Sequence, residues 1–319
     1  KDPSARDKVK QLKEVLSSKE EMLARIQNKI HQVVIRMPNM LAPDVPDGLD
    51  DSGNVELRKE GTIPTFDFKV RDHQELGELL GILDIPRGTT GAGACCYFWT
   101  GTGSLRAQAL YFWVQRVLVE RGFTMFMTPC VAKERTLFGT GYLPFFADQT
   151  YNLEGEDLAL IGTSEQTLVG YHADDVLDGA SLPLCYTAFT PCFRTEAGSY
   201  GKASRGIFRV HQFHKVEQIV FCKPEDSVKY HEMCLANEEY ILQQLGIPYH
   251  VVNVCVGDLG APGGIVAGIA VPELLHPGEI VEDRRRLIVA APHVEPPERG
   301  VVYQGQRHFP AHPGDIFRF

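Results

Sequence analysis

The chain has 319 residues, of which 44% are hydrophobic and 23% charged, and its formal net charge at neutral pH is −9. This balance is typical of one large or two modest globular domains, and it excludes a disordered or fibrous protein. The acidic total also argues against a protein that coats nucleic acid with its whole surface.

The apolar and cysteine patterns bear on location in the cell. No apolar run approaches the roughly 18 to 20 residues that cross a bilayer, and the polar segment after Lys1 is unlike a secretory signal. The eight cysteines include no C-x-x-C pair and no zinc-finger spacing, which indicates free thiols in a reducing compartment. We therefore predict a cytoplasmic protein without membrane contact.

Residues 1–37 differ in charge from the rest of the chain. They hold nine Lys or Arg against five Asp or Glu, a net +4, whereas the remainder holds 23 against 36, a net −13. Apolar residues recur at intervals of three or four between residues 9 and 34, which predicts one long amphipathic helix. Because a narrow apolar stripe needs a partner helix and the first residue is Lys1 rather than Met, we expect that partner upstream. The basic charge either solvates the helix or contacts a polyanion.

Composition then divides the chain into four segments. These are the helical arm 1–37, a Pro- and Gly-rich linker 38–70, a large domain 71–262, and an atypical tail 263–319. Strands that follow strands predict an α+β fold, in which a largely antiparallel sheet is flanked by helices. The predicted helices of the large domain are 76–83, 104–121 (capped by Ser104) and 227–245, and the predicted strands are 97–100, 124–128, 150–153, 158–162, 185–189, 206–221 and 250–256.

Residues 192–217 form the block richest in chemically active side chains. If 192–196 is a strand, Arg194 and Glu196 project from the same face. A returning strand from 207 would place Arg209, His211, Phe213, Lys215 and Glu217 on one face and Phe208, Val210, His214 and Val216 on the other. The intervening loop is glycine-rich and contains Lys202 and Arg205. Such a hairpin could hold a nucleoside triphosphate, because an arginine, metal ions and positioning suffice for attack at phosphorus. The alternative is an exposed hairpin with cross-strand ion pairs.

The sequence is less consistent with a metal site, a nucleophilic pair or nucleotide-binding glycine loops. His211, His214 and Glu217 have the spacing of helical metal ligands, but strand alternation sends His214 to the opposite face, so no metal site is predicted. Nothing in the spacing of Cys192 and His211 favours a nucleophilic pair. The glycine-rich stretches at 90–94, 101–104 and 260–264 lack the features of nucleotide loops and are predicted to be turns.

A second polar cluster closes the predicted strand 158–162. Thr163, Ser164 and Glu165 stand where a helix is expected to begin, so the hydroxyls could serve only as helix caps. Alternatively, they form a small polar pocket in which Glu165 offers a carboxylate to an ammonium group.

Together these motifs resemble a known family. The stretches PNMLAPDVPDG, RDHQELGELLGILD, GTGYLPFF, GTSEQTL, TPCFRTEAGSYGKASRGIFRVHQFHKVE and VCVGDLGAP resemble the seryl-tRNA synthetases, a family of class II aminoacyl-tRNA synthetases. The resemblance covers about residues 1–262. It implies an antiparallel catalytic sheet, a homodimer with Pro129 at the interface, and a coiled-coil arm that binds serine tRNA. It also implies that L-serine and ATP, expected with Mg²⁺, form seryl-adenylate before transfer to tRNA.

The resemblance also implies roles for individual residues. Thr163, Ser164, Glu165 and Glu217 would line the serine site. Arg194 would be the catalytic residue that holds the ATP α-phosphate. The remaining ATP-binding residues would be Thr195, Glu196, Val210, His211, Gln212 and Phe213.

Two departures from the family pattern affect these expectations. Only half of the arm is present, and the third class II motif is not recognisable in residues 263–319, where Glu279 and residues 284–286 give only a faint echo. A misassembled gene or a diverged paralogue would each explain the loss. We expect exposed strand edges near 250–256, weak ATP binding and little aminoacylation by this chain. The alternatives are a paralogue that delivers an amino acid to a carrier protein or small molecule, and an inactive binding or regulatory homologue.

Overall fold

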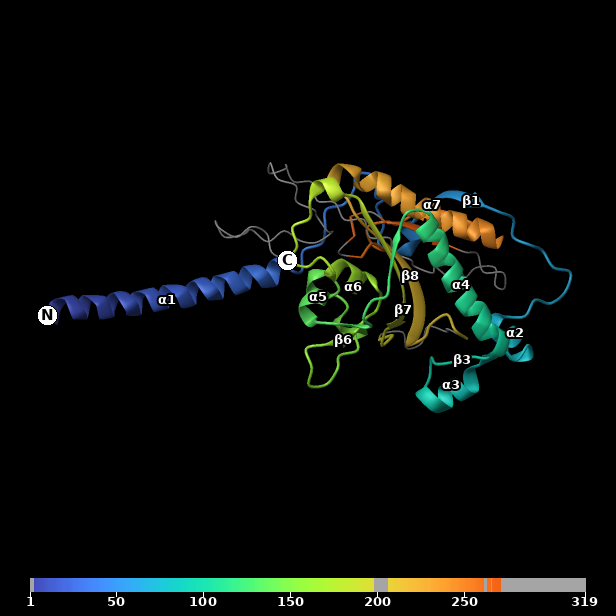
Figure 1. Ribbon diagram of the computed structural model, residues 1–319, viewed down its shortest axis with the longest axis horizontal. Coiled ribbons are helices and arrows are strands. Elements are labelled where there is room, and N and C mark those ends of the chain that lie inside the picture. Colours follow the sequence, from blue (N-terminus) through green and yellow to red (C-terminus); the bar gives the residue numbers. More distant parts are fainter. Residues whose placement is uncertain (1–2, 198–205, 261–262, 265, 271–319) are drawn as a thin grey trace.

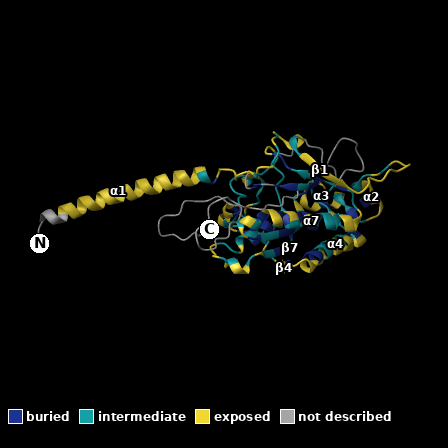
Figure 2. Cartoon of the chain, turned by 90° about the horizontal axis from the view of Figure 1, so that it is seen from above, coloured by how far each residue is buried: buried dark blue, intermediate teal, exposed yellow. Residues whose placement is uncertain are grey.

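A long helix projects from a globular body (Figure 1). The computed structural model describes residues 3–197, 206–260, 263–264 and 266–270. Helix α1 (Pro3–Val34) confirms the predicted amphipathic helix. Exposed residues cover almost all of the described part of α1 (Figure 2). Its apolar stripe therefore lacks a partner among the described residues of this chain.

The body is organised around a sheet in the order β4-β7-β8. Strands β7 (Leu184–Phe193) and β8 (Gln212–Phe221) pair antiparallel from Leu184 opposite Phe221 to Phe193 opposite Gln212. The short strand β4 (Thr124–Phe126) lies parallel to β7 at the edge. Every other strand pair of the described chain is antiparallel, which confirms the predicted fold class.

Helices cover both faces of this sheet. On one face, α4 (Gly101–Glu120) and α7 (Ser227–Leu245) pack through Leu118 and Cys234 against Val216 and Val220 of β8. On the other face, Leu168 of α6 (Glu165–Gly170) packs against Tyr186, Ala188 and Phe221. Because side chains alternate along a strand, odd-numbered residues of β8 face α6 and even-numbered residues face α4.

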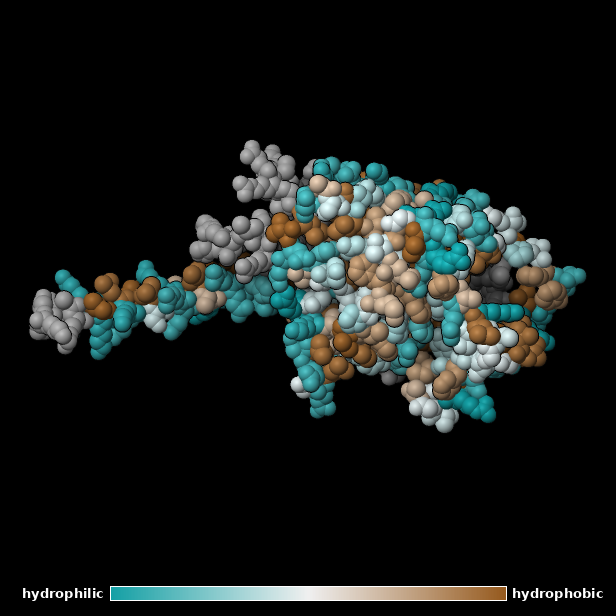
Figure 3. All heavy atoms as spheres, viewed as in Figure 1, coloured by the Kyte–Doolittle hydropathy of each residue, from teal (hydrophilic) through white to brown (hydrophobic). Residues whose placement is uncertain are grey.

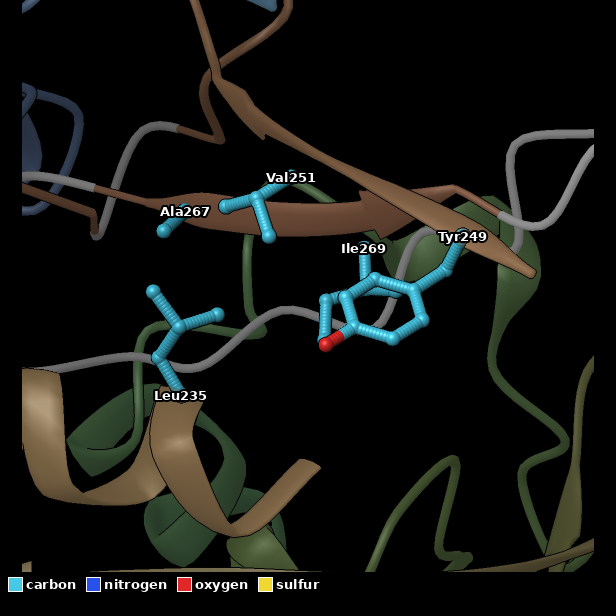
Figure 4. Close-up of a cluster of buried hydrophobic side chains, with 5 residues drawn as sticks. All are labelled: Leu235, Tyr249, Val251, Ala267 and Ile269. Carbon is cyan, nitrogen blue, oxygen red and sulfur yellow. The ribbon is translucent and has the colours of Figure 1, made fainter. Parts of the chain in front are cut away.

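A second sheet has the order β1-β9-β10 and packs on α7. Strands β1 (Val55–Glu60) and β10 (Ala267–Ala270) pair with opposite edges of β9 (Tyr249–Asn253). The cluster that joins this sheet to α7 consists of Leu235, Tyr249, Val251, Ala267 and Ile269 (Figure 4).

This second sheet differs from two sequence expectations. The segment predicted as a linker contributes β1 to the body. The expected exposed edges near 250–256 are wrong for β9, because β10, from the segment predicted as an atypical tail, covers one edge and β1 covers the other. The tail beyond residue 270 lies outside the described residues.

Several local predictions need correction. Helix α4 begins at Gly101 with Thr100 as its N-cap, so Ser104 is not the cap and the stretch 101–104 is helical. The stretch 90–94 runs out of α3 (Ile85–Ala92) and is only partly a turn. Residues 150–153 form no strand and make only an isolated bridge, from Asn152 to Ala159. The remaining elements are η1 (Asp51–Gly53), α2 (His73–Leu79), β2 (Leu83–Asp84), β3 (Phe98–Trp99), β5 (Val131–Ala132), α5 (Glu134–Gly139), η2 (Ala147–Gln149), β6 (Ala159–Leu160), η3 (Gly179–Ser181) and η4 (Pro224–Asp226).

The segment between α1 and β1 is bound closely to the body. The Ala42 amide donates to the Gly264 carbonyl over 2.9 Å. The side-chain amide of Asn253 donates to the Asp44 carbonyl over 2.8 Å, and Asn54 accepts from the Cys255 amide over 2.8 Å. These bonds tie the base of the arm to the second sheet.

Two further expectations concern location. No helix among the described residues is long and apolar enough to cross a membrane. All eight cysteines are free thiols.

Candidate active site

The polar turn between β6 and α6 lies against the α6 face of the central sheet. Thr163 and Ser164 are completely buried, and Glu165 and Gln166 are nearly so. The Gln166 side chain accepts a hydrogen bond from the Gly162 amide over 3.0 Å, and the Glu165 amide donates to Thr163 Oγ1 over 3.3 Å. These bonds replace the usual helix cap, since Ser164 makes no side-chain capping bond. Buried polar side chains are costly without partners, so their concentration here marks a site rather than a packed core.

Thr163 is linked to a buried ion pair on β8. Its hydroxyl donates to Glu217 Oε1 over 2.6 Å and accepts from Lys215 Nζ over 3.1 Å. Lys215 and Glu217 also contact each other directly. Both project toward α6, as the predicted alternation required. Lys215 was not among the predicted site residues, although its position on the Glu217 face was the signal that could have identified it.

Tyr142 is a second residue absent from the predicted site. Its hydroxyl donates to Glu165 Oε2 over 2.6 Å. Burial, reinforced by the carboxylates of Glu165 and Glu217, raises the pKa of Tyr142 well above its usual value, while Arg194 acts in the opposite direction. Tyr142 therefore stays protonated and remains a donor at neutral pH.

Arg194 follows β7 directly and lies beside the polar turn. Its amide donates to the His211 carbonyl over 3.0 Å. The guanidinium carbon stands 5.1 Å from the centre of the Phe213 ring, within the range of a cation–π contact. A Cβ placed on Gly162 would lie 3.8 Å from Arg194 Nε, so the side chain runs alongside the start of the turn. A cation thus lies beside the polar turn that contains Thr163.

The predicted strands around Arg194 are too long. Strand β7 ends at Phe193, and Glu196 adopts a left-handed conformation with φ of +53°, so strand alternation does not relate it to Arg194. Its carboxylate instead accepts from Arg209 over 3.2 Å. Thr195 donates its hydroxyl to the Asp148 carbonyl over 2.6 Å, which anchors this bend to η2.

The returning strand begins at Gln212 rather than at 206. The preceding residues leave the ladder because they bind elsewhere: the Ile207 amide donates to His73 Nε2 over 3.0 Å, and the His211 amide donates to the Cys95 carbonyl over 3.1 Å. The predicted basic residues Lys202 and Arg205 lie outside the described part of the chain.

The predicted ATP-binding residues 210–213 do not share one face. Phe213 lies on the Arg194 side, whereas Gln212 is exposed and belongs to the opposite face. Val210 is buried, and His211 Nδ1 lies 3.2 Å from the Arg194 carbonyl.

His214 lies opposite Glu217, as predicted. Its ring stacks on Phe189 at 5.4 Å and contacts Tyr111 on the α4 face. Among the described residues, no group of three or more His, Cys, Asp or Glu side chains could hold a metal ion. Burial raises the pKa of the Cys192 thiol, which opposes its use as a nucleophile.

The assembled site combines a cluster of buried polar side chains with an adjacent cation. Glu165 and Glu217 offer carboxylates to an ammonium or hydroxyl group, and Arg194 can hold an anion beside this cluster. This arrangement suits a zwitterionic amino acid next to a phosphate.

Comparisons with known proteins agree with this chemistry. The profile of the tRNA synthetase class II core domain (G, H, P, S and T) matches residues 149–294. The chain is 43% identical over 257 residues to the serine–tRNA ligase of Treponema denticola, covering 80% of this chain and 61% of that protein. It is 44% identical over 253 residues to that of Rubrobacter xylanophilus, covering 79% and 60% respectively.

Solved structures give the same result. The seryl-tRNA synthetase of Pyrococcus horikoshii complexed with ATP superposes with a TM-score of 0.81 at 35% identity, covering 88% of this chain and 66% of that chain. Over most of its length, the chain is similar to seryl-tRNA synthetases. The cytoplasmic serine–tRNA ligase of Naegleria fowleri in complex with AMP gives a TM-score of 0.78 at 29% identity, covering 83% and 64%.

Two facts qualify the extent of the family match. The chain spans about 60% of the length of the relatives named above. The class II profile continues to residue 294. The class II match therefore extends beyond residues 1–262, over which the sequence resembles the family, and includes part of the predicted tail.

Proposed function

We propose that this chain carries the serine-activating site of a serine–tRNA ligase. In the proposed reaction, serine and ATP form seryl-adenylate and pyrophosphate, and the seryl group then moves to the terminal ribose of serine tRNA. The observation that carries this proposal is the hydrogen-bonded set of Thr163, Lys215 and Glu217 beside Arg194, in a chain 43% identical to a protein named serine–tRNA ligase.

The geometry supports a division of roles. Thr163, Ser164, Glu165 and Glu217 would receive the ammonium and hydroxyl groups of serine, because a small pocket of buried carboxylates and hydroxyls favours a small polar substrate. The serine carboxylate is already ionised, so its attack on the α-phosphorus needs no general base. Arg194 would stabilise the charge that develops on the phosphate oxygens as pyrophosphate leaves.

The nucleotide would extend along the Arg194 side of β8. Phe213 and His211 offer ring faces there, while Thr195 and Glu196 lie in the bend that continues from Arg194. Val210 and Gln212 would contribute through the main chain, since their side chains are buried or point away.

Magnesium would arrive with the nucleotide. An ion held chiefly by phosphates needs only one or two protein carboxylates. Glu196 fits this requirement, since one of its oxygens accepts from Arg209 and a carboxylate offers further lone pairs. The ion would neutralise phosphate charge when bound.

The proposed partners are serine tRNA and a second copy of the chain. The exposed, basic α1 is long enough to reach a nucleic acid away from the body.

For the dimer, the sheet edge at β4 presents Met125, 49% exposed, and Met127, 97% exposed, just before the exposed Pro129. Hydrophobic side chains also gather over α2 (Figure 3), including Leu79 and Leu80. An edge strand with apolar neighbours needs a cover. The free cysteines support a reducing compartment such as the cytoplasm.

Serine-dependent exchange of pyrophosphate into ATP tests the activation step directly. We expect exchange with serine and none with alanine or threonine. A filter-binding titration of the chain with serine tRNA tests whether the chain binds the acceptor of the second step. Pyrophosphate exchange without any affinity for tRNA would favour delivery of the amino acid to a carrier protein. If no amino acid supports pyrophosphate exchange, the proposed activity of this chain is wrong.

A further inference from the structure

Tyr142 links the turn after α5 to the candidate serine pocket. The Tyr142 amide donates to the Leu137 carbonyl over 3.0 Å, so the residue is fixed by the end of α5. Its ring packs against the buried cluster of Ala132, Leu137, Ala159 and Ile161. The main chain and ring are thus held independently of any ligand.

The hydroxyl of this fixed side chain reaches one specific oxygen. It donates to Glu165 Oε2 over 2.6 Å, a short bond typical of a donor to a charged acceptor. Glu165 is only 7% exposed, so water has little access to replace that donor. The carboxylate is therefore oriented by Tyr142 rather than by solvent.

The electrostatic surroundings place the hydroxyl inside the site. The pKa of Tyr142 is raised by burial and by both pocket carboxylates, Glu165 and Glu217, and is lowered by Arg194. The Tyr142 hydroxyl therefore interacts electrostatically with Glu165, Glu217 and Arg194. The proposed function assigns serine or phosphate contacts to these three residues. Because the hydroxyl remains protonated at neutral pH, it can donate to Glu165 there.

From this geometry we propose that Tyr142 is a positioning residue for amino-acid binding, which fixes the Glu165 carboxylate so that it meets the ammonium or hydroxyl group of serine. This inference rests on the proposed function. Tyr142 acts through Glu165 and makes no contribution to ATP binding. A fixed carboxylate needs no reorientation when serine binds. If the carboxylate is mobile, the free energy needed to order it lowers the affinity of the site for serine.

The variant Tyr142→Phe removes only the hydroxyl and keeps the ring in its cluster. The probe is the sulfamoyl analogue of seryl-adenylate, with its Kd measured by calorimetry on the full chain, beside the Kd of ATP alone. We expect the analogue to bind about tenfold more weakly to the variant, which is about 1.4 kcal/mol. The Kd of ATP should be unchanged, and the KM for serine in pyrophosphate exchange should rise without a matching fall in kcat.

Tyr186→Phe is the matched control. Tyr186 also bears a hydrogen-bonded hydroxyl, 2.9 Å from His172 Nε2, but it lies in the core beside Leu168. Its loss should lower thermal stability without changing either Kd. A second control is the double variant of Tyr142→Phe with Glu165→Ala, which removes the acceptor of the Tyr142 hydroxyl. Because Tyr142 acts through Glu165, the double variant should bind the analogue no more weakly than Glu165→Ala alone.

The outcomes separate this inference from the proposed function. If the unaltered chain binds the seryl analogue but Tyr142→Phe binds it equally well, or weakens ATP to the same extent, the positioning role is wrong. Independent, additive losses in the double variant would also refute it. If the unaltered chain does not bind the seryl analogue, the proposed function fails and the inference falls with it.

Discussion

The hydroxyl of Thr163 donates to Glu217 over 2.6 Å although the two residues are 54 positions apart in the chain. The bond joins the turn before α6 to the middle of β8, and Lys215 binds both partners. The nearly buried Glu217 therefore has both an ionic partner, Lys215, and a neutral partner, Thr163. Its charge and its acceptor role can be separated by substitution.

Glu217→Gln removes the charge and keeps an acceptor for Thr163, whereas Glu217→Ala removes both. We expect the alanine variant to raise the KM for serine by more than the glutamine variant, because it leaves the Thr163 hydroxyl without the Glu217 acceptor. Losing the partner of the largely buried Lys215 should also lower stability, by at most about 3–5 kcal/mol. Exchange kinetics and thermal unfolding measure the two effects. An unchanged serine KM in both variants would contradict the assignment of Glu217 to the serine site.

Arg194→Ala should reduce serine-dependent pyrophosphate exchange by roughly 10² to 10³ with little change in thermal stability. The expected loss is in kcat, because the guanidinium acts on charge that develops in the transition state. Arg194→Lys is the control, since it retains a charge but loses the planar fork, and should recover only part of the rate. Exchange at the parental rate in the alanine variant would disprove the catalytic role.

Some of this architecture was readable in the sequence. The helix predicted at 227–245 coincides with α7, because its periodicity is regular and Gly246 ends it in a left-handed conformation with φ of +65°. Strand β1 was missed because all of its residues are exposed, so no alternating apolar pattern marks it. Only its antiparallel pairing with β9 identifies this segment as a strand.

The candidate site was predictable to a similar degree. Alternation along β8 correctly placed Glu217 and His214 on opposite faces. It could not identify Lys215 as only 21% exposed, since a lysine in a strand is usually exposed and this one binds Thr163 in the turn before α6. Tyr142 gave no local signal, because its contact with Glu165 depends on how α5 and α6 pack.

Acid should weaken the contact between β1 and α7. Arg58 donates to Glu239 across these elements over 3.0 Å, and this hydrogen bond holds the pKa of the Glu239 carboxyl below its unfolded value of 4.5. The stabilisation is thus present above pH 4.5 and is lost as the pH falls through the lower folded pKa. Glu239→Gln should be less stable than the parent near pH 7 and should approach it near pH 3. Melting temperatures that differ equally at both pH values would contradict this prediction.

Met127→Lys tests the proposed dimer. Met127 is 97% exposed beside the edge strand β4, so a lysine there should not disturb the fold of one copy. We expect sedimentation to report a dimer for the parent and a monomer for the variant, with unchanged circular dichroism. Leu49→Lys, at a residue 96% exposed and far from β4 in the chain, is the control and should remain dimeric. A parent that sediments as a monomer would refute the dimer.

Because α1 projects from the body, a small rotation where the chain leaves the body produces a large displacement of its far end. The helix has 32 residues, and at about 1.5 Å per residue it is roughly 48 Å long. At that length, a rotation of about 10° at the base moves the tip by about 8 Å. The segment that follows α1 is held by Asn253 and Gly264, which bind the main chain at Asp44 and Ala42. A substitution at Asn253, remote from both the tip and Arg194, is therefore expected to change where the tip lies without touching either.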